Sequence, residues 1–309
     1  MKSIRETATA IVFEEKFMSG VTGVILAGGE SRRFGSVKVL AKTSSGKTVI
    51  ELIVDALLNS NSVGEVLVSV SNIELGEKLK TTLGLNYVID VVDKVKGPQA
   101  GMLSVMKTLG INTKILFLPG DIPWVTSRFI EAFIERAQAS NAIVSSPLWG
   151  NGVIEPLISY VYVREELIKT FHDSVFFKRT CRPTDLHRSA SRLVLIGVSL
   201  LTSNLYELSD VNVPEDLTSP KVKFSGSRDL LVLEENSSLF REAINMLRSG
   251  DSTRASLMFK DEGEVYEKAK AYHLAYQAYL DALIYGMGEV EAKVNNIRKV
   301  MGIGRFHTR

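Results

Sequence analysis

Two candidate phosphate sites lie close together in residues 24–48, VILAGGESRRFGSVKVLAKTSSGKT. The first is a pair of glycines followed within ten residues by three cations. Glycine lets the backbone approach a ligand closely, a guanidinium binds phosphate as a planar fork, and a lysine acts as a mobile point charge. The residues of this site are Gly28, Gly29, Arg32, Arg33 and Lys38.

The second candidate is a relaxed P-loop, Ala41-x4-Gly46-Lys47-Thr48. A P-loop needs a buried strand directly before its first glycine and a helix that begins at the Lys-Thr pair. The pattern after Thr48 predicts the helix, but residues 35–40 are too short and charged for a central strand, and Ala41 replaces the first glycine. The alternative is a solvated turn that leads into a helix, and we favour the first candidate.

A carboxylate suited to Mg²⁺ follows the apolar run 115–118, in Pro119-Gly120-Asp121-Ile122-Pro123. Magnesium usually takes one or two carboxylates from a protein and its other ligands from phosphates and water. Asp121 beside a triphosphate would therefore suffice. A lone aspartate after a strand is often a helix cap, but Thr126 or Ser127 can serve as that cap here.

Strands and helices are predicted to alternate through the first half of the chain. This alternation predicts right-handed βαβ units, hence an α/β fold with a doubly wound, mainly parallel sheet whose ligands bind at the carboxyl ends of the strands. The expected strands are 21–27, 65–70, 87–92, 114–118 and 142–146, and the expected helices are 49–58, 75–83, 100–109 and 127–139.

The pattern changes near residue 226. From Leu230 onward no convincing strand is predicted, and residues at helical spacing predict about four helices. A break is expected at 250–252, with Asp251 or Ser252 as the N-cap of the next helix. We expect an extension at 1–20, an α/β domain at 21–226 and an all-α helical appendage at 227–309. Four tyrosines at helical spacing favour packing over an interface with a partner or a second copy: Tyr266, Tyr272, Tyr276 and Tyr279.

Composition excludes several classes of protein. The chain has 309 residues, 45% of them hydrophobic, and 37 basic residues against 35 acidic ones, so no electrostatic footprint for nucleic acid or an anionic membrane is present. Cys181 is the only cysteine, which excludes an intrachain disulfide and fits a reducing cytoplasm. Residues 1–20 are too acidic for a signal peptide, and Met18 is an alternative start. We expect a cytoplasmic protein that binds neither nucleic acid nor a membrane.

Four motifs, in order, resemble a known family. Residues 26–38, LAGGESRRFGSVK, match the signature L-A-G-G-x-S-x-R-x-G-x-x-K of the nucleotidyltransferases similar to molybdenum-cofactor guanylyltransferase. Residues 97–101 resemble the family's G-P-x-x-G turn, and residues 119–123 its metal-binding P-x-D-x-P segment. Residues 210–217 are similar to its D-x-N-T-P-E-D-L, with Val213 in place of threonine. The resemblance covers residues 21 to about 220.

The resemblance implies a Rossmann-like sheet of the nucleotide-diphospho-sugar-transferase type and Mg²⁺-dependent transfer of a nucleotide to a phosphorylated acceptor, with release of pyrophosphate. Arg33 and Lys38 would clamp the triphosphate, while Asp121 and Asn212 would hold Mg²⁺. No general base is needed, because the attacking phosphate oxygen is already anionic. The implied nucleotide-binding residues are Leu26, Ala27, Gly28, Gly29, Arg32, Lys38, Asn72, Gly97, Pro98 and Gly101.

The substrates stay open at this point. GTP is favoured over CTP, and molybdopterin, an adenosylcobinamide phosphate and a sugar phosphate would each offer a phosphate nucleophile. Trp149, Gly152 and residues 155–157 fall where the acceptor should bind, although a core or turn role fits them equally well. Two other functions are weighed: a P-loop NTPase that uses Lys47 and Thr48, and a nucleotide-sensing scaffold without catalysis.

Overall fold

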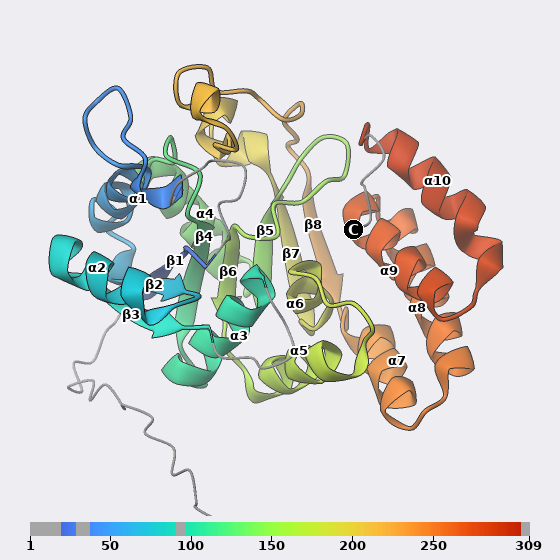
Figure 1. Cartoon of the computed structure of the whole chain (residues 1–309). Coiled ribbons are helices and arrows are strands. Elements are labelled where there is room, and N and C mark those ends of the chain that lie inside the picture. The colour runs from blue at the N-terminus through green and yellow to red at the C-terminus, as the bar shows by residue number, and fades with distance from the viewer. Residues whose placement is uncertain (1–19, 29–37, 91–96, 304–309) are drawn as a thin grey trace, which may run out of the picture.

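The apolar runs of the sequence form one sheet in the computed structural model, which describes residues 20–28, 38–90 and 97–303 (Figure 1). Gly29, Arg32 and Arg33 of the predicted site lie outside the described residues, as do residues 1–19. The described strands form an eight-stranded sheet in the order β3-β2-β1-β4-β6-β5-β7-β8. Their bounds are Val21–Leu26 (β1), Val63–Val70 (β2), Asn86–Ile89 (β3), Lys114–Pro119 (β4), Val144–Leu148 (β5), Ser159–Tyr162 (β6), Arg192–Gly197 (β7) and Leu230–Glu234 (β8).

The sheet is mainly parallel, as predicted. β1 pairs in parallel with β2 and β4, β2 with β3, and β5 with β7, whereas β6 runs antiparallel between β4 and β5. Leu26 at the end of β1 lies opposite Ser69 of β2 and Pro119 of β4. Because the carboxyl ends of these strands lie level, the loops that follow them meet at one edge of the sheet.

Helices cover both faces of the sheet: in Figure 1, α3 and α5 lie in front of it and α4 lies behind it. The central strands are largely buried, as expected for strands covered on both faces; all five residues of β5 are buried, its two serines included. Thr126 is the N-cap of α4, which leaves Asp121 without a capping role. The helices are Val49–Leu58 (α1), Ile73–Leu83 (α2), Pro98–Leu109 (α3), Ser127–Ala139 (α4), Glu165–Phe177 (α5) and Thr184–Arg188 (α6).

The C-terminal helical segment consists of α7 Ser238–Arg248, α8 Ser252–Lys268, α9 Tyr272–Ile284 and α10 Glu291–Val300. It confirms the prediction of about four helices after the sheet. Asp251 is the N-cap of α8, since its side chain accepts a hydrogen bond from the Arg254 N–H. Tyr266 and Tyr279 are buried within the segment, and the Tyr279 ring packs directly on Gly263 of α8. These tyrosines therefore pack helices together, as favoured from the sequence.

The prediction that no strand occurs from Leu230 onward is wrong. Residues 230–234 form β8, which pairs antiparallel with β7 from Ile196 opposite Leu230 to Arg192 opposite Glu234. A run of only four apolar residues beside a helical stretch carries too little periodicity to identify an edge strand. β6 and β7 were not predicted from the sequence, and β5 begins at Val144, two residues after the predicted start. No helix in the described ranges is long and apolar enough to cross a membrane.

Candidate active site

Three residues from three separate motifs meet at the carboxyl edge of the sheet. The Lys38 ammonium donates a hydrogen bond to Asp121 Oδ2 over 2.8 Å and contacts Asn212 Oδ1 at 3.4 Å. These residues are 83 and 174 positions apart from Lys38 in the chain. The side chains of Lys38 and Asp121 are 16% and 29% exposed, so the group is open to solvent on one side.

Backbone hydrogen bonds hold the motif segments against one another. The Gly120 N–H donates to Leu26 O over 3.0 Å, and the Val211 N–H donates to Asp121 O over 2.8 Å. A Cβ at Gly120 would lie 2.9 Å from a methyl group of Val39 and 3.1 Å from Leu26 O, so only glycine fits at this crossing. The loop that carries Asp121 is thus fixed between β1 and the 210–217 segment.

The 210–217 segment is shaped by its own carboxylates. Asp216 Oδ2 accepts hydrogen bonds from the N–H groups of Asn212 and Val213 over 2.8 and 3.0 Å, and these bonds lower the pKa of Asp216. Asp210 Oδ2 accepts a hydrogen bond from Asn212 Nδ2 over 3.0 Å, which turns Asn212 Oδ1 toward Lys38. The turn is therefore held by Asp216, with Val213 at the position where the family has threonine.

The donor set fits a hard divalent cation. Asp121 Oδ2 and Asn212 Oδ1 both contact the Lys38 ammonium, so the two oxygens point toward one positively charged group. Mg²⁺ binds through one or two carboxylate or carbonyl oxygens and completes its octahedron with phosphates and water. Among the described residues, no group of three or more His, Cys, Asp or Glu side chains could hold a metal alone. The site thus has the few protein oxygens that a metal shared with a triphosphate requires.

A residue that the sequence analysis missed is Asp90, which follows β3. Ser69 Oγ donates a hydrogen bond to Asp90 Oδ1, and a Cβ at either Gly28 or Gly101 would meet this pair. The two predicted glycine turns therefore close around one carboxylate. Burial, opposed by the Ser69 hydrogen bond, raises the pKa of Asp90 to about 6. A lone aspartate at the end of YVID carries no sequence signal that marks it as part of a site.

The raised pKa of Asp90 predicts a pH-dependent stability. Its protonated form favours the folded state below the ordinary pKa of 3.8, and this contribution is lost as pH rises through about 6. Asp90→Asn is therefore expected to stabilise the protein by about 1–2 kcal/mol at about pH 8, but not at about pH 3.5. Urea unfolding at both pH values measures this effect. A difference that does not change with pH would contradict it.

The remaining predicted nucleotide contacts lie beside Asp90 and Gly28. The Ala27 N–H donates to Ser69 O and the Leu26 carbonyl accepts from Gly120, so both groups are engaged within the protein. Gly97 has φ +113°, and Pro98 opens α3 directly after it, which places the predicted turn at a helix N-terminus. Asn72 is exposed and caps α2 by accepting from the Leu75 N–H over 2.9 Å, so its contact with a base stays a prediction.

The rival P-loop residues make ordinary structural contacts. Lys47 pairs with Asp55 over 2.6 Å, with both side chains about half exposed. Thr48 forms a capping box with Glu51 at the start of α1. Within the described residues, a short 3₁₀ turn at Lys38–Leu40, not a strand, precedes this loop. Residues 41–48 thus form the solvated turn before a helix that the sequence offered as the alternative.

A second polar group lies on the side of the site away from Asp90. Glu155 accepts a hydrogen bond from Trp149 Nε1 over 2.8 Å and bonds from the Lys223 ammonium over 3.1 and 3.2 Å. Lys223 also lies 3.9 Å from Asp210. Burial disfavours the charged form of Lys223, but Glu155 and Asp210 outweigh it and raise the pKa of the ammonium. Lys223 lies outside the four motifs, so no pattern could identify it.

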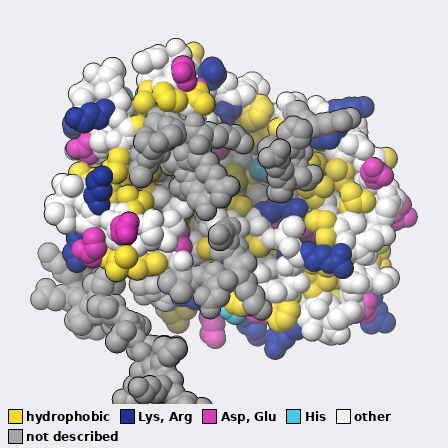
Figure 2. Space-filling model, viewed as in Figure 1, with side chains coloured by type: hydrophobic (Ala, Val, Ile, Leu, Met, Phe, Trp, Pro, Cys, Tyr) yellow, Lys and Arg dark blue, Asp and Glu magenta, His cyan; other side chains and the backbone are white. Residues whose placement is uncertain are grey.

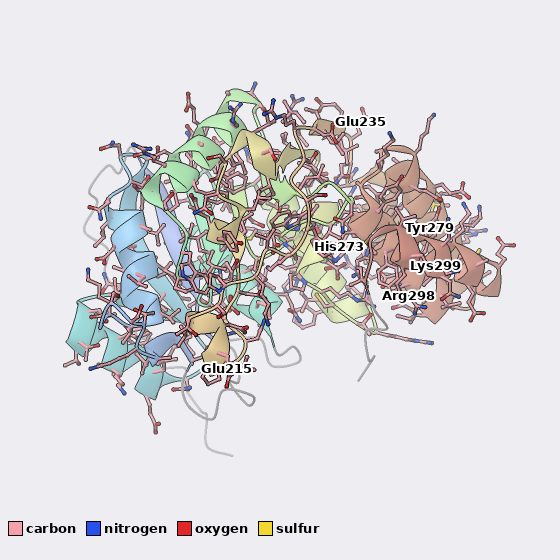
Figure 3. The ribbon with its side chains drawn as sticks, turned by 90° about the horizontal axis from the view of Figure 1, so that it is seen from above. Glu215, Glu235, His273, Tyr279, Arg298 and Lys299 are labelled. Carbon is pink, nitrogen blue, oxygen red and sulfur yellow. The ribbon has the colours of Figure 1, made fainter. Side chains whose placement is uncertain are left out.

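Charged side chains of both signs are interspersed on the described part of the surface shown in Figure 2. Viewed from above, Glu215 marks the 210–217 segment, far from Arg298 and Lys299 of α10 (Figure 3). The edge with Lys38, Asp121 and Asn212 is therefore separate from the outer face of the C-terminal helical segment.

Comparisons with known proteins relate the chain to one family. A family model described as "MobA-like NTP transferase domain" matches residues 23–175. The chain is 35% identical over 136 residues to the "Probable molybdenum cofactor guanylyltransferase" of Thermococcus sibiricus, covering 44% of this chain and 65% of that one. It is 34% identical over 141 residues to the protein of that name from Pyrococcus horikoshii, covering 46% and 68%. The matches thus span about two thirds of these relatives.

The fold agrees with that of a solved relative. The crystal structure of "Molybdopterin-guanine dinucleotide biosynthesis protein A" from Archaeoglobus fulgidus superimposes with a TM-score of 0.54 at 18% identity. The superposition covers 64% of this chain and 95% of the other. It therefore relates the sheet and its helices to a known architecture and leaves a third of the chain outside the likeness.

Proposed function

The chain belongs to the MobA-like NTP transferase family, and on this premise we propose that it transfers GMP from GTP to a phosphorylated acceptor of the molybdopterin type. The observation that carries the proposal is the convergence of Lys38, Asp121 and Asn212 at the carboxyl edge of the sheet. An ammonium, a carboxylate and an amide oxygen suit a triphosphate and its metal. The family signature over residues 26–38 supports the same chemistry.

In the proposed reaction, an oxygen of the acceptor phosphate attacks the α-phosphorus of the nucleotide, and the bond to the β-phosphate breaks to release pyrophosphate. The attacking oxygen is already anionic, so the protein supplies position and charge and no general base. Mg²⁺, held by Asp121 and Asn212, would neutralise charge on the phosphates. Lys38 clamps the triphosphate and balances the charge of the departing pyrophosphate.

We place the nucleotide on the β1–β3 side of the site, over the edge formed by Gly28, Asp90 and Gly101. Arg33 of the signature is proposed to join Lys38 on the triphosphate, with Gly29 and Arg32 alongside. The turn 97–101 would contact the base or ribose through backbone groups at the start of α3. CTP in place of GTP, and an adenosylcobinamide phosphate or a sugar phosphate as acceptor, would use the same catalytic residues.

Ligand-dependent stability tests this proposal. The melting temperature is measured with GTP, CTP, ATP or UTP, each with and without Mg²⁺. A ligand that binds only the folded state adds roughly 2.7 kcal/mol at a hundred times its Kd, which shifts the midpoint by several degrees. GTP with Mg²⁺ is expected to give the largest shift, and omission of Mg²⁺ to reduce it. A melting temperature that stays equal to that of the free protein with each of the four nucleotides would contradict nucleotide transfer.

A further inference from the structure

The polar contacts of the site continue past Asn212 to a second lysine. Asn212 donates to Asp210, which lies 3.9 Å from the Lys223 ammonium, and Lys223 donates to both carboxylate oxygens of Glu155. This row therefore joins Lys38 to a second ammonium through two oxygen-bearing side chains, Asn212 and Asp210, and Glu155 lies beyond that ammonium. Lys38 and Lys223 are thus the two cations on either side of Asn212 and Asp210.

The order of the strands places this second ammonium on the far side of Asp121 from the edge proposed for the nucleotide. Asp90 follows β3, Gly28 follows β1 and Asp121 follows β4, whereas Glu155 lies in the connection between β5 and β6. β5 ends at the same edge as β4, because both run antiparallel to β6. Along this edge, Asp121 therefore separates the side proposed for the nucleotide from the side with Lys223. A second substrate that reacts beside Asp121 must approach from the Lys223 side.

Lys223 is held in place yet open to solvent. Its side chain is 24% exposed, whereas that of Lys178, which belongs to a buried ion-pair network, is 0% exposed. An ammonium has three N–H donors. Within the described ranges, both of the hydrogen bonds that Lys223 makes go to Glu155, so a donor remains for a ligand.

Trp149 fixes both members of the pair. Its indole N–H bonds Glu155, and its ring, which is 1% exposed, packs edge-on against Phe224, the neighbour of Lys223. The same loop is attached to the C-terminal helical segment. Asn151 donates to Met301 O over 2.6 Å, and the His273 N–H donates to Gly152 O over 3.0 Å.

His273 lies at the junction of that segment with the sheet in Figure 3. The helices thus brace the loop that positions Glu155.

We propose that Lys223 binds the phosphate of the acceptor substrate, with Glu155 and Trp149 as positioning residues. The inference rests on the proposed function for the identity of the acceptor, since it names where the second phosphate of that reaction binds. A fixed ammonium at this point would hold the attacking oxygen beside Asp121 and offset the repulsion between two anionic substrates. The chemical class recognised is a phosphate monoester.

Inorganic phosphate is the probe, because it needs neither turnover nor a known acceptor. Its binding to protein saturated with GTP and Mg²⁺ is measured by calorimetry for the wild type, Lys223→Met, Lys223→Arg and the control Lys221→Met. Lys221 is a neighbour whose side chain is 81% exposed and lies 3.7 Å from Asp216. Lys223→Met is expected to raise the Kd for phosphate by about tenfold, the loss of one charge-assisted hydrogen bond. Lys223→Arg and Lys221→Met should bind phosphate nearly as the wild type does.

The Kd for GTP with Mg²⁺ is measured on the same proteins and is expected to stay within about twofold. Phosphate affinity that is equal in the wild type and Lys223→Met, or GTP affinity that falls as much as phosphate affinity, would overturn the inference. The double variant Lys223→Met with Glu155→Gln removes the pair without leaving a lone buried carboxylate, and it should show the same selective loss. Failure of the wild type to bind GTP would instead reject the proposed function. The assignment of Lys223 would still be decided by the Kd for phosphate of the wild type and Lys223→Met.

Discussion

Replacing Asp121 by asparagine is expected to lower the kcat for nucleotide transfer by at least about a hundredfold. Asp121 is the carboxylate that bonds Lys38, and its loop is fixed by backbone hydrogen bonds to Leu26 and Val211. Asparagine keeps the shape of the side chain and removes the charge that would hold Mg²⁺. Lys38→Ala is expected to cause a comparable loss, because it removes the ammonium that balances the triphosphate. Steady-state rates at saturating GTP and Mg²⁺ measure both effects.

Lys47→Ala is the matched control for these variants. Lys47 comes from the rival phosphate motif, lies nine residues from Lys38 in the chain, and pairs with Asp55 on the surface. Its rate is expected to equal that of the wild type within about twofold, since an exposed ion pair contributes little. The opposite result would contradict this account: if Lys47→Ala were strongly inactivated while Lys38→Ala and Asp121→Asn stayed active, the P-loop residues would be the ones that bind the phosphates.

The second large effect is expected in the buried ion-pair network that joins the sheet to the C-terminal helical segment. Arg188 of α6 contacts Glu262 of α8, and it lies 2.5 Å from Asp281 of α9. Lys178, after α5, lies 2.8 Å from Asp185 and 2.6 Å from Asp281. Each of these five side chains is at most 2% exposed. Among the described residues, the two carboxylates that the helices supply, Glu262 and Asp281, therefore pair with cations from the α/β part.

Arg188→Met is expected to lower the free energy of unfolding by about 3–5 kcal/mol, because it removes the cation that pairs with the buried Glu262 and one of the cations that pair with Asp281. The loss should appear in urea unfolding as a single shifted transition, since the network spans both parts of the chain. The control is Arg254→Met, which removes a 74% exposed partner of Asp251 and should cost less than about 1 kcal/mol. A loss for Arg188→Met as small as that of the control would show that the network does not hold the helices to the sheet.

The convergence of Lys38, Asp121 and Asn212 could be predicted because each of them lies in a short motif with a defined geometry. Gly-Gly after a strand, Pro-Gly-Asp-Ile-Pro after another and Asp-x-Asn in a turn restrict the backbone locally, and parallel strands bring such loops to one edge. In the structure the Lys38 side chain contacts the other two at this edge, as the motifs predict. The doubly wound fold was predictable from periodicity for the same reason.

The other parts of the site could not be predicted because they depend on contacts between distant residues. Residues 155–157 were placed near the acceptor, but Lys223, which is 68 positions from Glu155, was not, and Asp90 becomes notable only when Gly28 and Gly101 close on it. No motif marks Arg188, Glu262 or Asp281, and their burial follows from how α8 and α9 pack against α6. β8 was missed because its pairing with β7, and not its composition, makes it a strand.

The most direct test of the central claim follows the α-phosphate of GTP. The protein is incubated with Mg²⁺, molybdopterin and GTP labelled at the α-phosphorus, and the products are separated and counted. We expect the label to appear in a molybdopterin dinucleotide, with one pyrophosphate released for each label transferred, and both products to form at least about a hundredfold more slowly with Asp121→Asn. Release of inorganic phosphate from the γ-position, with the α-label left in GDP, would contradict nucleotide transfer and identify the protein as a hydrolase.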